Sequence, residues 1–107
     1  MNVVITGSGS RVREKVKDIA CYTAHKLMPR VKNVEVEINL IPHLLLKEGI
    51  YGDCICDPDF ITVPKNFVIR IDSRLSHRDL CIAVAHEMIH VKQFAKRELY
   101  DSKVNSK

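Results

Sequence analysis

A histidine pair with a glutamate directly after the first histidine lies late in the chain, in the stretch IAVAHEMIHVKQF over residues 82–94. On an α-helix, side chains four positions apart project from the same face, so His86 and His90 can both offer an imidazole nitrogen to one metal ion. Glu87 lies about 100° around the helix from His86, where it is a poor third ligand but can deprotonate a metal-activated water. The pattern therefore predicts a zinc site with His86 and His90 as ligands and Glu87 as the general base of a peptidase.

A helix whose two histidines are simply packed is the competing interpretation of this short pattern. The residues around His86 and His90 are almost all apolar, which predicts a helix that is largely buried. A carboxylate at position 87 would be costly in such surroundings unless it had a role. The sequence therefore favours a functional site over packed histidines.

The longer stretch AVAHEMIHVKQFAKREL, residues 83–99, resembles the active-site helix of zincin metallopeptidases. It is especially similar to small metallopeptidases encoded by tailed phages and bacteria, whose helix reads much like A-H-E-x-x-H-V-K-Q-[YF]-x-x-x-E-L. The similarity is looser over residues 33–75 and absent over residues 1–10. It implies a minimal zincin-like fold, zinc as cofactor, His86 and His90 as its ligands, and Glu87 as general base. It also implies an edge strand, here residues 50–56, that holds an extended peptide substrate by main-chain pairing.

The third metal ligand is not evident from the sequence, although a catalytic zinc usually has three protein ligands and one open position. Metzincin-type enzymes place another histidine six residues after the second, where this chain has Lys96. Gluzincin-like and SprT-like enzymes take this ligand from a later segment, yet no histidine follows His90. Glu98 and Asp101 would lie about 12 Å and about 16 Å beyond His90 on a straight helix, so either would need a turn in the chain. The alternatives are earlier loops, water, or another subunit, and the loop candidates are His43, Asp57, Asp59 and His77.

Several other side chains have chemistry that the sequence leaves open. Gln93 shares the metal-facing stripe of the helix, where it could support a ligand, bind substrate, or remain a half-exposed polar residue. Cys54 and Cys56 would face the same side of a strand, as metal-binding thiolates or as small buried hydrophobes. Tyr51 and Tyr100 are candidate oxyanion donors, but nothing in the sequence selects either.

The elements that must position these residues can be outlined from hydrophobic periodicity. Residues 11–28 repeat apolar positions at three and four spacing, which predicts an amphipathic helix. Alternation over residues 33–41 predicts a half-buried strand, and residues 2–5, 50–57 and 67–72 are β-rich, whereas residues 43–49 read as a loop or short turn. Ser76 and Asp79 have the form of a capping box that begins a long helix over residues 77–98. The expected fold class is therefore α+β, with an N-terminal helix, a small mixed sheet of three to four strands and a long C-terminal active-site helix.

Composition and charge set wider limits on the chain. Its 107 residues, of which 46% are hydrophobic and 28% charged, predict one globular domain over residues 1–107. No apolar run approaches the about 20 residues that span a bilayer. The four cysteines and the absence of a recognisable export signal favour reduced thiols in the cytoplasm, or in the host cytoplasm for a phage protein. The net charge of +4 is small; it is compatible with nucleic-acid binding but does not indicate it.

The sequence is compatible with two functions. The first is a zinc-dependent peptidase that acts on peptide or protein substrates. The second is a catalytically incomplete zincin-fold protein that acts as a binding or regulatory module. The unidentified third ligand favours the module, whereas Glu87 favours the peptidase because a purely structural zinc site does not need an adjacent base.

Overall fold

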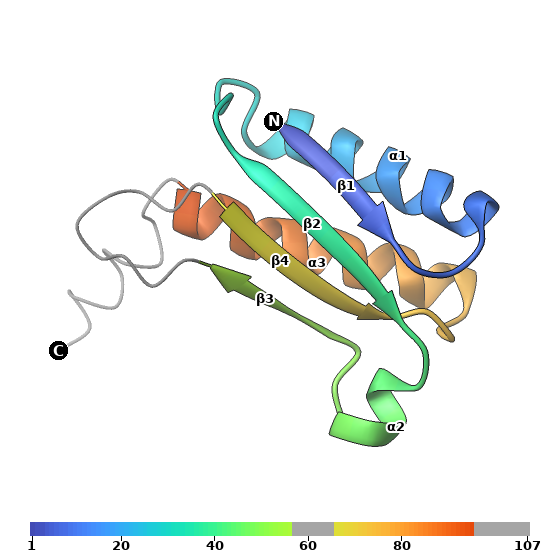
Figure 1. The fold of residues 1–107 in the computed structure, drawn as a ribbon. Helices are drawn as coiled ribbons and strands as arrows, with labels where there is room; N and C mark the ends of the chain where they lie inside the picture. The colour runs from blue at the N-terminus through green and yellow to red at the C-terminus, as the bar shows by residue number, and fades with distance from the viewer. Residues whose placement is uncertain (57–65, 96–107) are drawn as a thin grey trace, which may run out of the picture.

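The computed structural model describes residues 1–56 and 66–95 of the chain (Figure 1). Along the sequence the elements are β1 (Asn2–Thr6), α1 (Ser10–Leu27), β2 (Glu35–Ile41), α2 (Leu44–Glu48), β3 (Gly52–Cys56), β4 (Asn66–Asp72) and α3 (His77–Ala95). The expected α+β class, with a mixed sheet and a long C-terminal helix, is confirmed.

The strands of the described residues form one sheet in the order β1-β2-β4-β3 (Figure 1). β1 pairs with β2 and β2 with β4 in parallel, whereas β3 runs antiparallel to β4. β3 therefore occupies one end of the sheet order and is its only antiparallel strand among the described residues. The expectation of an edge strand near residues 50–56 is met by this placement.

Helices α1 and α3 cover one face of the sheet, and the core lies between them and the strands (Figure 1). Alternate residues of the central strands point into this core, as in Ile38 of β2 and Ile69 of β4, which are neighbours in register and fully buried. α1 packs against α3 and β1, and its buried residues include the small Ala20 and Ala24. The opposite face carries exposed side chains such as Glu35 and Glu37, which explains the alternating pattern of that strand.

The structure differs from the sequence-based outline at α2, which replaces the expected loop or turn. Residues 44–48 form a short helix that begins after His43 in the left-handed region and ends at Gly49, also left-handed. The helix depends on a distant partner, because the Leu45 N–H donates to Oδ2 of Asp72 at 2.9 Å. No local pattern in residues 43–49 announces that contact.

α3 begins as the capping residues predict and carries the histidine pair. The Asp79 N–H donates to Oγ of Ser76 at 3.2 Å, which satisfies one of the unpaired donors at the helix start. The helix is described to Ala95, so its predicted continuation to residue 98 lies outside the described residues. None of the helices that the structure describes is both long and apolar enough to cross a membrane.

Candidate metal centre

The imidazoles of His86 and His90 converge on one side of α3. Their Nε2 atoms are 3.2 Å apart, and the rings meet edge to face with centroids 4.8 Å apart. The spacing of one helical turn brings the rings together, as the sequence pattern predicts. The pair is open to solvent on one side, with His86 exposed and His90 half-buried.

This separation can be compared with what a single zinc ion requires. Zinc–nitrogen bonds of about 2.0–2.1 Å at tetrahedral angles place two ligand nitrogens about 3.3–3.4 Å apart. The observed 3.2 Å lies close to that value. Both Nε2 atoms can therefore reach one ion with only small side-chain movements.

Gln93 supports one member of the pair. Its Oε1 lies 3.0 Å from Nδ1 of His90. An Nδ1–H of His90 can donate to this amide oxygen, and the lone pair of Nε2 is then available to a metal ion. A ligand histidine usually donates its other N–H to such a partner, which fixes the orientation of the ring. Of the roles considered for Gln93, the geometry fits support of a ligand.

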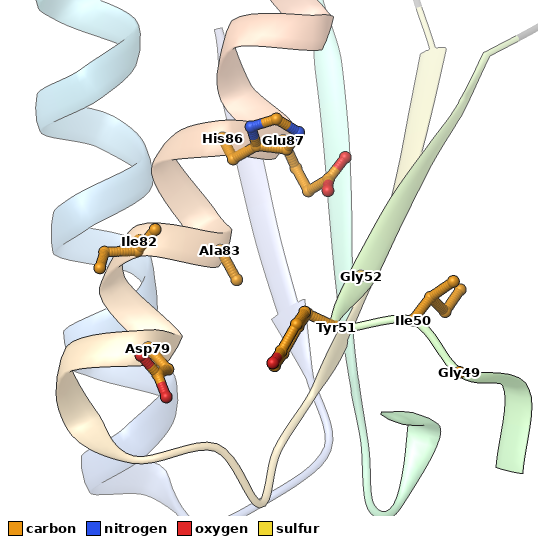
Figure 2. Close-up of a pocket in the computed structure, with 9 residues that line it drawn as sticks. All are labelled: Gly49, Ile50, Tyr51, Gly52, Asp79, Ile82, Ala83, His86 and Glu87. Carbon is orange, nitrogen blue, oxygen red and sulfur yellow. The ribbon is translucent and has the colours of Figure 1, made fainter. Parts of the chain in front are cut away.

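Glu87 points from α3 towards β3 (Figure 2). The residue is only 5% exposed, and no hydrogen bond from a residue described in the structure reaches its carboxylate. Burial raises the pKa of Glu87 above its ordinary value, although the nearby His90 and His86 oppose the change, and the negative charge of Asp53 adds to it. A carboxylate in these surroundings accepts a proton more readily than an exposed one.

A cavity of about 430 Å³ opens between α3 and the start of β3 (Figure 2). It is lined by residues 49–52 on one side and by Asp79, Ile82, Ala83, His86 and Glu87 on the other. Glu87 and His86 lie at one end, and Asp79 lies two helical turns away at the other. A substrate segment next to the histidine pair would therefore find space beside the start of β3.

Contacts on the outer face of the sheet anchor the edge strand. Nε of Arg70 donates to Oδ1 of Asp53 at 2.9 Å, and Nη1 of Arg70 donates to Oε2 of Glu48 at 3.0 Å. Gly52 also lies so close to β4 that an added Cβ would stand 2.6 Å from the carbonyl oxygen of Arg70. These contacts hold β3 and α2 beside the cavity.

Among residues 1–56 and 66–95, no group of three His, Cys, Asp or Glu side chains could hold a metal ion. His43 is placed next to Asp72, where it begins α2, and His77 contacts Sγ of Cys81 at 3.7 Å in the first turn of α3. Cys54 packs partly against the core. The remaining candidates fall outside the described residues, and they are Asp57, Asp59, Glu98, Tyr100 and Asp101, together with the side chain of Cys56.

No protein-family model matches the chain, and no curated protein or solved structure matches it significantly. The case for a function therefore depends on the geometry of this site.

Two contributors to the site are not evident in the sequence pattern. Asp53 influences Glu87 and is held by Arg70, but that pairing follows from the register of β3 and β4, which the sequence does not give. Asp79 lines the cavity, whereas the sequence signals only its role in capping α3. The helical period could have placed Asp79, Ala83 and His86 on the same side of the helix. It could not have shown that residues 49–52 lie opposite them.

Proposed function

We propose that this chain is a zinc-dependent peptidase in which His86 and His90 hold the metal and Glu87 is the general base. The observation that carries the proposal is the convergence of the two Nε2 atoms, 3.2 Å apart, beside Glu87, which is 5% exposed and whose carboxylate lines a cavity. Packed structural histidines would not need such a neighbour, because partial removal of a carboxylate from water costs stability.

The residues of the chain divide the chemistry of peptide hydrolysis among them. Bound zinc supplies a Lewis acid that polarises the substrate carbonyl and acidifies water. Glu87 takes the proton of the attacking water at a carboxylate oxygen and delivers it to the leaving amine nitrogen. In the metal-free chain, burial raises the pKa of Glu87, which makes its carboxylate a better proton acceptor than an exposed one. Gln93 keeps the His90 ring turned so that Nε2 faces its partner.

The edge strand gives the proposed peptidase a place to hold its substrate. β3 pairs with β4 along one side and lies next to the cavity that contains Glu87. A peptide added to the other side in extended form would be held by main-chain hydrogen bonds. The scissile peptide bond would then lie beside the carboxylate of Glu87. Successive side chains of the bound peptide would point alternately towards and away from the cavity.

The cytoplasm, or the host cytoplasm for a phage protein, is the compartment that we propose for this activity. Cys21 and Cys81 carry thiols in the structure, which suits a reducing compartment. Peptides and proteins are the proposed partners, and no feature of the site calls for nucleic acid.

A catalytically incomplete zincin-like module is the second candidate. One observation favours it, because the described residues contain no three-ligand metal group. Two histidines with further water ligands would bind zinc more weakly than three protein ligands. Such a protein would act through its surface contacts rather than through Glu87.

Metal-dependent hydrolysis separates the two candidates. The full chain is loaded with zinc and incubated with a mixed peptide library, and cleavage products are identified by mass spectrometry. For the peptidase, we expect cleavage that a chelator abolishes and added zinc restores. Stoichiometric zinc binding without cleavage of any peptide would instead support the module.

A further inference from the structure

From the cavity beside Glu87, we infer that the site selects a lysine or arginine side chain directly after the scissile bond, with Asp79 as the specificity-determining residue. This inference rests on the proposed peptidase function and adds a substrate class to it. It depends on the chemistry of the lining, the length of the cavity, and the direction in which a peptide pairs with β3.

The lining combines apolar walls with an acidic end. Its lining includes the apolar or aromatic residues Ile50, Tyr51, Ile82 and Ala83. Tyr51 and Ile82 are each 56% exposed, so these apolar surfaces are open to a ligand. No lysine or arginine is among the lining residues in the described part of the chain. Such walls accept the alkyl stem of a basic side chain and leave its charged end for a carboxylate.

Asp79 is available to bind that charged end. Its backbone N–H is used by Ser76, but its exposed carboxylate forms no hydrogen bond or ion pair within residues 1–56 and 66–95. The neighbouring cations Arg74 and Arg78 form no ion pair with it in the same residues. An acidic residue in the first turn also stabilises a helix, but that role does not require it to line a cavity.

The cavity has the length that a long side chain needs. Asp79 precedes Glu87 by two helical turns and a fraction, which corresponds to about 12 Å along the axis of α3. A substrate residue whose peptide bond lies beside Glu87 must reach most of that distance to meet Asp79. An extended lysine or arginine side chain, together with one hydrogen-bond length and the side chain of Asp79 itself, covers most of that distance, whereas aspartate, serine or valine is too short.

The direction of β3 decides which substrate residue enters the cavity. Residues 49–52, which line the cavity, lie at the beginning of β3. A peptide that pairs antiparallel to β3, the more stable arrangement, therefore places its C-terminal part beside these residues. The side chain in the cavity then belongs to the residue that follows the scissile bond.

Matched peptides test this selectivity without relying on cleavage. Two hexapeptides differ only at the residue that follows the expected scissile bond, which is lysine in one and norleucine in the other. The two side chains share an alkyl stem and differ in charge. Binding to the full chain, with and without zinc, is measured by isothermal titration calorimetry, and chemical shifts of Tyr51, Ile82 and Ala83 locate it. We expect the lysine peptide to bind about fivefold more tightly, as a partly exposed ion pair would give.

Asp79→Asn should reduce this preference to about one, whereas Glu14→Gln, which removes an exposed carboxylate from α1, should leave it unchanged. Added salt provides a second readout that needs no variant, because it should weaken only the lysine peptide. Equal binding of the two peptides to the unmodified chain, or a preference that survives both Asp79→Asn and salt, would overturn the inference. A lysine preference without zinc-dependent cleavage would instead refute the peptidase while retaining the cavity as a site for basic side chains.

Discussion

Two carboxylates are buried in the described part of this molecule, and their surroundings change their proton affinity in opposite directions. Asp72 is 3% exposed and Glu87 is 5% exposed. Burial raises the pKa of Asp72, but backbone N–H groups of Arg74, Leu45 and His43 outweigh it and leave the pKa below its ordinary value. Burial also raises the pKa of Glu87, and there it prevails.

The difference shows that burial alone does not define a carboxylate's role. Oδ2 of Asp72 accepts the Leu45 N–H at 2.9 Å, and Oδ1 accepts the Arg74 N–H at 2.8 Å, so the charge is used to join α2 to the end of β4. Glu87 faces a cavity and has no such donors among the described residues. One carboxylate is held by backbone donors, and the other faces a cavity without them.

Catalysis gives the largest expected difference between the two positions. Glu87→Gln removes the proton acceptor and should lower kcat/KM for a cleaved peptide by about 10²–10⁴-fold, with zinc content retained. Asp72→Asn should leave kcat/KM per folded molecule within about twofold, because Asp72 does not line the cavity. Steady-state kinetics with metal analysis of both variants makes the measurement. Comparable losses in the two variants would remove the distinction between them.

Stability should show the reverse order. Asp72→Ala leaves backbone N–H groups of Leu45 and Arg74 without their acceptor and should cost about 2–3 kcal/mol of unfolding free energy. Glu87→Gln removes a poorly solvated charge and should cost nothing measurable in the metal-free chain. Urea unfolding followed by circular dichroism reports both values. A larger loss for Glu87→Gln would mean that Glu87 is held by structural contacts.

The pH dependence of stability gives a smaller effect with opposite signs. The pKa of Asp72 is lowered by folding, so its contribution is present above its ordinary value of 3.8 and is lost as pH falls through the folded pKa. The pKa of Glu87 is raised by folding, so stability declines as pH rises from its ordinary value of 4.5 through the folded pKa.

In the metal-free protein, Asp72→Asn should therefore abolish the fall in stability on the acid side. Glu87→Gln should abolish the decline in stability as pH rises above 4.5. Urea midpoints across this range, with Glu14→Gln as the surface control, measure the slopes. Parallel curves for all three variants would contradict the assigned shifts.

Local periodicity was sufficient to predict the elements that carry the site. The alternation in β2 reflects one buried face, and α3 was evident from its capping residues and apolar content. The expectation that α3 is largely buried was wrong, because Ile82 and Ile89 are 56% and 41% exposed. The convergence of His86 and His90 also follows from one helical turn. In each case the information is contained within a few neighbouring residues.

Contacts between distant segments could not be predicted in this way. α2 depends on Asp72 in a strand that comes much later, and the pairing of Asp53 with Arg70 depends on strand register. The cavity requires residues 49–52 to lie opposite Asp79, which no single segment specifies. The sequence does not identify a third metal ligand, and two of the candidates, Glu98 and Asp101, lie outside the described residues.

The most direct test of the account is the zinc environment of the full chain. X-ray absorption at the zinc edge, with one equivalent of metal, should show imidazole nitrogens at about 2.0–2.1 Å. His86→Ala and His90→Ala should each remove one imidazole from the spectrum and weaken zinc binding, whereas His77→Ala should change neither. Failure of the unmodified chain to bind zinc, or a spectrum that is unaltered by loss of His86 and of His90, would contradict the central claim.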